Sequence, residues 1–326
     1  MKLTCLAILF VSIAFGFSLR TVQASTPIIL DTDIASDIDD VGALTMLNAF
    51  QQNHEASILA VIVDDANRYA PCAVQAIDTY WGHASIPVGQ VKSGASNDYS
   101  RYTKYLANNF PNAFNGDGAG AEDATTLYCR TLAAADDRSV TIICIGHLVA
   151  VDALLNSSTG MQLVKQKVSQ FVIMGGEYAT KPNTDFSSTQ AEFNFGSWKP
   201  AASSDFVRKL NTLEIPAIFI GWSAGLPIRT GDFTGALPVD DPTRAAWREY
   251  NNNAGRCSWD ELATLYGVRG TSPGLSLSQG VNTIDAATGN NTFTAGAGTQ
   301  FYVTKTAPDN ALAAIVNELI DSVPSR

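Results

Sequence analysis

Near the N-terminus, five aspartates fall within ten residues, directly after a short apolar run. They are Asp31, Asp33, Asp37, Asp39 and Asp40, in the segment IILDTDIASDIDDVGAL of residues 28–44. Carboxylates crowded in this way repel one another, so their pKa values rise unless positive charge is brought to them. A divalent cation held by several carboxylate oxygens would bring that charge, and an all-oxygen donor set suits Ca²⁺ or Mg²⁺. The alternative is an acidic, solvated loop in front of a capped helix.

Two widespread aspartate patterns fit this segment poorly. An EF-hand calcium loop requires glycine at its sixth position and glutamate at its twelfth, whereas counting from Asp31 gives Ser36 and Gly42. Phosphatases of the haloacid dehalogenase type carry D-x-D-x-[TV] after an apolar strand, and DTDIA has Ala35 in the last place. That match is partial. It would make Asp31 a nucleophile and Asp33 an acid.

The elements that position these residues alternate between apolar runs typical of buried strands and segments with helical spacing. Predicted strands cover residues 27–30, 57–63, 140–146, 171–176 and 215–221, and predicted helices cover residues 39–50, 71–82 and 309–320. Continuously apolar strands that are followed by helices predict an α/β fold with a mostly parallel open sheet and helices on both faces. Such sheets bind ligands at the carboxyl ends of their strands. Residues 97–123 are predicted to form a loop over that edge, and residues 280–300 irregular structure or short hairpins.

Residues 1–24 have the features of a secretory signal peptide, so a single domain of residues 25–326 is expected to be exported. Residues 3–17 are almost wholly apolar, and VQA (residues 22–24) is a small-residue cleavage site. The apolar run is shorter than the ~20 residues of a membrane anchor, so no membrane association is expected. Loss of Lys2 and Arg20 with the signal takes the net charge from −10 to near −12. An acidic chain of this kind is a poor ligand for nucleic acid.

Cysteines and sequons are compatible with export. Four cysteines follow the signal: Cys72, Cys129, Cys144 and Cys257. In an oxidising compartment they allow zero, one or two disulfides, and their spacing lacks the C-x-x-C of zinc sites. Asn156 and Asn290 each begin an N-x-[ST] sequon, as expected of a secreted glycoprotein.

Several motifs together resemble the inosine-uridine-preferring nucleoside hydrolase family. DTDIASDIDDVGAL resembles the family's N-terminal signature D-x-D-P-G-x-D-D, with two extra residues and with Ile34 and Ala35 in place of Pro and Gly. IGHLVA (residues 145–150) loosely resembles G-P-L-T-N at a strand end. IMGG (residues 173–176) matches well, AEFN (residues 191–194) is identical, and SWDE (residues 258–261) stands where H-D-P is usual. The motifs follow the family's order and span most of residues 25–326.

The resemblance implies a Ca²⁺ ion at the carboxyl edge of the sheet and hydrolysis of the N-glycosidic bond of a small-molecule ribonucleoside, giving free base and ribose. Asp33, Asp40 and Asp260 would hold the metal together with the backbone carbonyl of Ile145. Asp33 would also be the general base for the attacking water. Ca²⁺ would help to place water and sugar together, and nearby carboxylates would stabilise an oxocarbenium-like transition state.

Further residues map onto family positions around the nucleoside. Asp39 would bind the ribose 2′-hydroxyl, although Asp37 lies in the insertion and competes for that alignment, and Asp31 would orient the loop. The other substrate-binding residues implied are Asn67, Met174, Asn183, Glu192 and Asn194. Glu192 would accept from the 5′-hydroxyl and Asn194 would contact the 3′-hydroxyl. Asn183 is equally well a turn residue after Pro182, and Asp64 and Asp65 compete with Asn67.

Activation of the leaving base is where the chain departs from the commonest family pattern. Many members have a histidine before the last metal aspartate, whereas this chain has Trp259. His54, His83 and His147 are expected to have structural or surface roles. Trp-Asp resembles the purine-specific members, in which the indole stacks on the base and helps it to leave. Purine preference is therefore a hypothesis that depends on Trp259, with Trp222 or Tyr250 as the second face of a sandwich.

A non-catalytic alternative remains on the same scaffold. The missing Pro-Gly and the missing histidine would also suit a secreted relative that binds nucleoside or metal without hydrolysis. Family members are often dimers or tetramers, so the resemblance allows a homo-oligomer, but no interface signature is present in the sequence.

Overall fold

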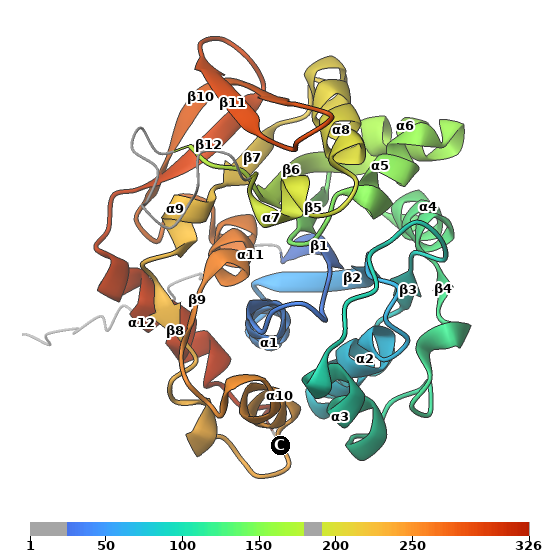
Figure 1. Cartoon of the computed structure of the whole chain (residues 1–326), viewed down its shortest axis with the longest axis vertical. Helices are drawn as coiled ribbons and strands as arrows, with labels where there is room; N and C mark the ends of the chain where they lie inside the picture. The colour runs from blue at the N-terminus through green and yellow to red at the C-terminus, as the bar shows by residue number, and fades with distance from the viewer. Residues whose placement is uncertain (1–24, 179–190, 326) are drawn as a thin grey trace, which may run out of the picture.

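A ten-stranded sheet forms the centre of the molecule (Figure 1). The computed structural model describes residues 25–178 and 191–325. From one edge to the other, the strands are β11 (Asn291–Ala295), β10 (Leu275–Ile284), β12 (Gln300–Lys305), β7 (Ala217–Ile220), β6 (Val168–Met174), β5 (Val140–Cys144), β1 (Thr26–Thr32), β2 (Ala56–Val63), β3 (Val88–Gln90) and β4 (Glu122–Asp123). The strands from β12 to β4 run parallel, and β10 pairs antiparallel with both β11 and β12. A separate antiparallel ribbon joins β8 (Arg229–Thr230) to β9 (Arg256–Cys257).

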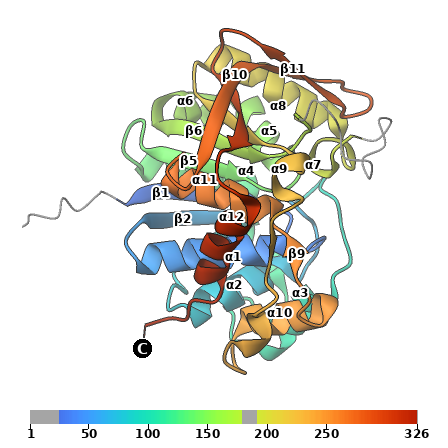
Figure 2. The same ribbon diagram turned by 90° about the vertical axis from the view of Figure 1, so that its left-hand side faces the viewer.

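Helices cover both faces of this sheet, which confirms the predicted architecture. One face carries α1 (Asp39–Gln52), α2 (Ala70–Tyr80), α3 (Arg101–Asn109), α10 (Pro242–Asn251), α11 (Trp259–Arg269) and α12 (Asp309–Ile320). The other face carries α4 (Ala124–Ala134), α5 (Val149–Asn156), α6 (Ser158–Lys167) and α8 (Pro200–Leu213). The short helices are α7 (Phe193–Gly196), α9 (Trp222–Gly225), η1 (Gly118–Gly120) and η2 (Thr234–Ala236). Figure 2 shows the β10–β11 hairpin at one end of the molecule and α10 at the other.

The alternation of side chains along β1 explains why its sequence is continuously apolar. Ile28 and Leu30 belong to the core under α1 and α11, whereas Ile29 belongs to the core under α4 and α5. Successive residues of a strand point to opposite faces, so a strand covered on both faces needs apolar residues at every position. The polar residues begin only where β1 ends, at the carboxyl edge of the sheet.

Two sequence predictions outside the strands have different outcomes. Residues 97–123 are not simply a loop, because they contain α3 and η1. The Ser100 hydroxyl accepts from the Thr103 amide at 3.3 Å and caps α3, while Tyr102 and Leu106 bury one face of the helix. The hairpin prediction for residues 280–300 is confirmed by the antiparallel strands β10, β11 and β12.

All four cysteines of the described residues have free thiols. Cys72, Cys144 and Cys257 are buried, and Cys129 is half-buried. Of the pairings that the sequence allows, the structure therefore has none between the described cysteines. No helix within residues 25–178 and 191–325 is long and apolar enough to cross a bilayer. Both the signal peptide and Asn183 lie outside the described residues.

A buried carboxyl group on α2 makes stability depend on pH. Asp78 is fully buried, its Oδ1 accepts from Asn48 Nδ2 at 2.9 Å, and its Oδ2 has no hydrogen-bond partner in the described structure. Burial raises the pKa of Asp78 from the ordinary 3.8 to about 7. The native state thus binds a proton that the unfolded chain releases, so the stability associated with this proton is lost as the pH rises from about 4 to about 7.

We expect Asp78→Asn to stabilise the protein increasingly as the pH rises. The amide keeps an acceptor for Asn48 and carries no charge to bury. The gain in the free energy of unfolding above pH 7 is at most roughly 4 kcal/mol, the equivalent of the shift in pKa. Thermal unfolding of variant and parent at pH 5 and pH 8 measures this gain. Asp136→Asn, at an exposed position, is the control. An equal gain for Asp78→Asn at both pH values would contradict the assignment.

Candidate active site

A cavity of about 720 Å³ opens at the carboxyl ends of the central strands. Asp33 follows β1, Ile145 follows β5 and Met174 ends β6, and all three line the cavity. The first turns of α1, α9 and α11 also line the cavity, the last two through Trp222 and Trp259. A volume of this size accommodates a small polar ligand with room for water.

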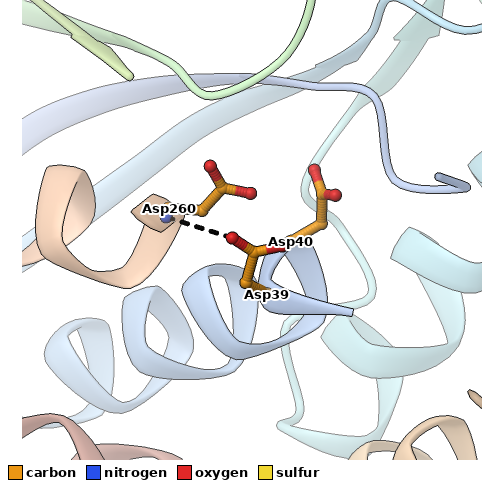
Figure 3. A group of neighbouring side chains, drawn as sticks. All are labelled: Asp39, Asp40 and Asp260. Atoms are coloured by element: carbon orange, nitrogen blue, oxygen red, sulfur yellow. Dashed lines mark hydrogen bonds between the residues drawn. The ribbon is translucent and has the colours of Figure 1, made fainter. Parts of the chain in front are cut away.

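Three carboxylates from two helices meet in this cavity (Figure 3). Asp39 and Asp40 begin α1, Asp260 lies in the first turn of α11, and one oxygen of each lies within 4.8 Å of the others. The Asp260 amide also donates to Asp39 Oδ2 at 3.4 Å. The two helices approach closely at Gly42, where any Cβ would collide with the Glu261 carboxylate.

Burial and mutual repulsion act on these three groups in the same direction. The pKa of each is raised well above its usual range, first by burial and then by neighbouring carboxylates. Asp33 is the strongest such neighbour of Asp40, and Asp39 is the strongest neighbour of Asp260. Buried oxygen donors with excess negative charge fit a hard divalent cation.

Asp33 lies beside this triad rather than in it. Its Oδ2 accepts from Ser36 Oγ at 3.2 Å and lies 3.5 Å from His147 Nδ1. Burial, followed by repulsion from Asp65, raises the pKa of Asp33 to about 7. The closest group of carboxylates therefore contains Asp39 where the resemblance places Asp33, although both line the same cavity.

His147 contacts the Asp33 carboxylate, which the sequence did not reveal. It is buried, and its Nε2 lies 2.8 Å from the Ser197 hydroxyl. That hydroxyl donates its proton to the Phe193 carbonyl at 2.7 Å. Ser197 must then accept from Nε2–H, which leaves the Nδ1 lone pair of a neutral imidazole facing Asp33. The available signal was its position after the glycine that ends a strand.

The AEFN motif joins the ends of β5 and β6 at the cavity wall. Asn194 Nδ2 donates to the Ile145 carbonyl at 3.0 Å and to the Met174 carbonyl at 3.2 Å. Glu192 accepts from the amides of Gly176 and Asn194, each at 2.9 Å, and burial raises its pKa to about 7. The structure thus brings together four of the residues implied by the resemblance: Ile145, Met174, Glu192 and Asn194.

Asn67 is not brought to the site. Its Nδ2 donates to the Asp98 carbonyl at 2.7 Å and its Oδ1 accepts from the Tyr69 amide at 2.8 Å, so the side chain closes its own loop away from the cavity wall. Asp65 is similarly occupied, with acceptor contacts to Ser96 Oγ at 2.5 Å and the Asn67 amide at 2.6 Å.

Asp31 and Asp64 are buried and lie off the cavity wall. Asp31 Oδ2 accepts from the Tyr128 hydroxyl at 2.5 Å. Burial is the main cause that raises the pKa of both carboxyl groups, and repulsion between them adds to that of Asp64. Asp31 therefore supports the loop after β1 rather than facing a substrate.

Trp259 is stacked on Trp222, with ring centroids 4.3 Å apart and planes 24° apart. Its Nε1 donates to the Trp222 carbonyl at 3.0 Å. Two rings in direct contact leave no gap for a base between them, so the predicted sandwich with Trp222 as second face is wrong in this structure. Both rings instead form one aromatic wall of the cavity, to which Tyr250 also contributes.

An ion pair fixes the two-residue insertion of the first motif. Arg256 Nε donates to Asp37 Oδ1 at 2.9 Å and to Oδ2 at 3.0 Å, and Nη2 also pairs with Oδ2. The Tyr102 hydroxyl donates to the Asp37 carbonyl at 2.7 Å. The guanidinium carbon lies 4.9 Å from the Trp259 ring centroid, and Arg256 lines the cavity. Asp37 is thus an anchor, which leaves Asp39 in the carboxylate group.

The carboxylate-lined cavity at the carboxyl edge of an open parallel sheet defines an α/β enzyme that acts on a small polar substrate. The chain belongs to the inosine-uridine preferring nucleoside hydrolase family, whose sequence model matches residues 28–289. The protein is therefore a hydrolase that acts on the N-glycosyl bonds of nucleosides, and the phosphatase alternative is set aside.

Solved structures share the fold at low sequence identity. An inosine-guanosine nucleoside hydrolase has a TM-score of 0.71 at 16% identity, over 92% of this chain and 100% of that one. An inosine-uridine preferring nucleoside hydrolase from Bacillus anthracis has a TM-score of 0.65 at 16% identity, over 91% and 100%. A type III effector protein, XopQ, complexed with adenosine diphosphate ribose, has a TM-score of 0.69 at 16% identity, over 92% and 94%. No curated protein sequence matches the chain.

Gly146 lets the end of β5 approach the backbone of Asp33. A Cβ at this position would lie 2.5 Å from the Asp33 amide nitrogen and 2.8 Å from Asp64 Oδ2, closer than real Cβ contacts. Neither atom belongs to the flexible end of a long side chain. Any side chain at position 146 therefore displaces the backbone that carries Asp33.

We expect Gly146→Ala to lower nucleoside hydrolysis at least tenfold, because a misplaced catalytic group is costly even when the shift is about 1 Å. Hydrolysis rates and thermal unfolding are measured together. Gly120→Ala is the matched control, since a Cβ there meets nothing within 4 Å. Full activity of Gly146→Ala would show that the site tolerates displacement of Asp33.

Proposed function

We propose that the protein is a calcium-dependent, purine-preferring ribonucleoside hydrolase that releases free base and ribose. The observation that carries the proposal is the group of three buried carboxylates, Asp39, Asp40 and Asp260, inside the cavity of a nucleoside hydrolase fold. Burial, followed by repulsion from neighbouring carboxylates, raises the pKa of each of the three, and a bound cation would favour their charged forms.

The proposed calcium ligands are Asp33, Asp40 and Asp260 with the carbonyl of Ile145. The Ile145 carbonyl accepts one hydrogen bond from Asn194, which leaves its second lone pair for a cation. Calcium is favoured over magnesium because it accepts a larger and less regular set of oxygen donors. When bound, calcium would acidify the attacking water and hold the sugar hydroxyls.

The residues of the chain supply the rest of the reaction. Asp33 is the proposed general base: it takes a proton from water while the Ser36 hydroxyl donates a hydrogen bond to its Oδ2. Asp39 would accept a hydrogen bond from the ribose 2′-hydroxyl. The carboxylates stabilise positive charge that develops on the anomeric carbon as the bond to the base breaks.

The far end of the ribose is assigned to the β6–α7 side of the cavity. Asn194 is proposed to contact the 3′-hydroxyl, Glu192 the 5′-hydroxyl, and Met174 the apolar face of the sugar. The hydrogen bonds of Asn194 to the ends of β5 and β6 support its role, since they fix the amide before any substrate arrives. Preorganised contacts of this kind cost little on binding.

The aromatic wall supports the preference for purines. Trp222, Tyr250 and Trp259 offer a broad ring surface against which the leaving base packs, and a purine covers more of it than a pyrimidine. Trp259 is the proposed catalytic aromatic residue, because it immediately precedes the metal ligand Asp260. Its indole nitrogen is held by Trp222, so the ring is fixed in place.

One observation favours a non-catalytic alternative. No histidine is among the described residues that line the cavity, so a histidine acid for the departing base is missing there. A nucleoside- and metal-binding protein without hydrolytic activity would have the same carboxylates and aromatic wall. Turnover separates the two functions.

We expect ribose release from inosine and guanosine to exceed release from uridine and to fall at least tenfold with a calcium chelator. Added Ca²⁺ should restore the rate better than Mg²⁺. The cation neutralises the carboxylates and acidifies the attacking water, and Ca²⁺ suits this irregular set of oxygen donors better. A reducing-sugar assay on the purified protein measures the rate for each nucleoside in four conditions: untreated, with chelator, and with chelator followed by Ca²⁺ or by Mg²⁺.

Asp40→Asn should remain slow at saturating Ca²⁺, whereas Asp136→Asn, an exposed matched substitution, should behave as the parent. A rate that resists the chelator would refute calcium dependence. Inosine binding without release of ribose would establish the non-catalytic alternative, and equal rates for purines and uridine would remove the purine preference.

We also propose that residues 1–24 direct export and are removed, which leaves a secreted domain of residues 25–326. The supporting observations are the apolar run of residues 3–17 and the small residues that end at position 24. Expression in an exporting host should yield protein in the medium with Ser25 at its N-terminus, as read by intact mass. Retention inside the cell with Met1 intact would contradict export.

A further inference from the structure

Arg256 brings a positive charge to the base side of the cavity. Among the described residues that line the cavity, it is the one arginine or lysine. It lies in β9, three residues before Trp259, and its guanidinium lies over that ring. Its side chain is about one third exposed, so the group is fixed by its neighbours and still reaches the cavity.

The ion pair with Asp37 leaves a defined set of donors. A guanidinium has five N–H groups, one on Nε and two on each Nη. Asp37 engages Nε and Nη2 along one edge of the fork. Nη1 makes no hydrogen bond to an acceptor oxygen within the described residues. The end of the fork, with one N–H from each Nη, is therefore available to a ligand.

We propose that Arg256 recognises the N7 and O6 acceptors of a 6-oxopurine, so that inosine and guanosine are preferred over adenosine. Arginine pairs in this way with guanine because N7 and O6 are adjacent acceptors that match two parallel N–H groups. Adenine carries an amino donor in place of O6, and that donor would face an N–H of the guanidinium. Asp37 sets the orientation of the fork. The inference rests on the proposed nucleoside hydrolysis and adds the class of base.

The same contact assists departure of the base. When the bond from C1′ to N9 breaks, its electron pair stays on the purine, and the water oxygen bonds to C1′ while Asp33 takes one water proton. Hydrogen bonds from the Arg256 fork to N7 and O6 stabilise the negative charge on the departing ring. Arginine keeps its own protons, so the base takes its proton from solvent water after departure.

The test compares kcat/KM for inosine and adenosine in the calcium-loaded enzyme and in two variants. The parent should favour inosine by about tenfold or more, as one bidentate contact gives. Arg256→Lys keeps the positive charge without the forked donors, and Arg256→Met keeps neither. In both variants the ratio of kcat/KM for inosine to that for adenosine should fall to within about twofold of one, whatever the absolute rates. Arg229→Lys is the matched control on the paired strand β8, since Arg229 does not line the cavity.

Measurements on the parent enzyme alone keep the inference testable where a variant fails to fold. Replacement of N7 by carbon in 7-deazainosine, or loss of O6 in purine riboside, should each lower kcat/KM at least fivefold relative to inosine. Equal rates for inosine and adenosine in the parent, or an unchanged ratio in Arg256→Lys, would overturn the role of Arg256.

Equilibrium binding separates this inference from the proposed hydrolysis. Calorimetry with free hypoxanthine and free adenine requires no turnover, and hypoxanthine should bind about tenfold more tightly to the parent but not to Arg256→Lys. If no nucleoside is hydrolysed and this difference persists, the base site stands and the proposed hydrolysis fails. If nucleosides are hydrolysed and both bases bind equally, the proposed hydrolysis stands and the role of Arg256 in base recognition fails.

Discussion

Repulsion among buried carboxylates is the constraint on which the site depends. The start of α1, the start of α11 and the end of β1 bring Asp33, Asp39, Asp40 and Asp260 into one cavity, and all four side chains are buried. Burial contributes most to every raised pKa in this group. A chain would not retain such a cost for stability alone, because hydrophobic residues of similar size would pack there more favourably. The arrangement makes sense when a cation and a developing positive charge on the sugar share the site.

Rigid surroundings keep these groups in place against their repulsion. Gly42 lets α1 pack against α11, and Gly146 lets β5 lie against the Asp33 backbone. Asn194 makes hydrogen bonds to the ends of both β5 and β6, and Glu192 caps α7, the helix that contains Asn194. These contacts are close and buried, so small shifts are costly. The function of the fold is therefore to hold oxygen donors at fixed positions along one sheet edge.

Much of the fold and part of the site could be predicted from the sequence, because they follow from local patterns. Buried parallel strands are continuously apolar, which predicts the sheet and its ligand edge, whereas the resemblance to the family motifs located Asp33, Ile145 and Met174. His147 and Arg256 could not be found in this way, because their roles come from contacts with residues distant in sequence. Arg256 meets Asp37 across 219 positions, and no local spacing records such a pair. Trp222 was identified as an aromatic neighbour, but direct stacking on Trp259 depends on how α9 and α11 pack.

The insertion of the first motif illustrates how one such pair alters the site without increasing its net charge. Asp37 adds a carboxylate close to Asp39, and the repulsion raises the pKa of Asp39, whereas Arg256 lowers it. The charges of Asp37 and Arg256 cancel at long range, but their positions differ. Both residues line the cavity: the carboxylate is satisfied by the fork, and the guanidinium lies over Trp259. The Asp37–Arg256 pair therefore leaves Asp39, Asp40 and Asp260 as the closest group of carboxylates and places a positive group beside the aromatic wall, so that the two sides of the cavity carry opposite charges.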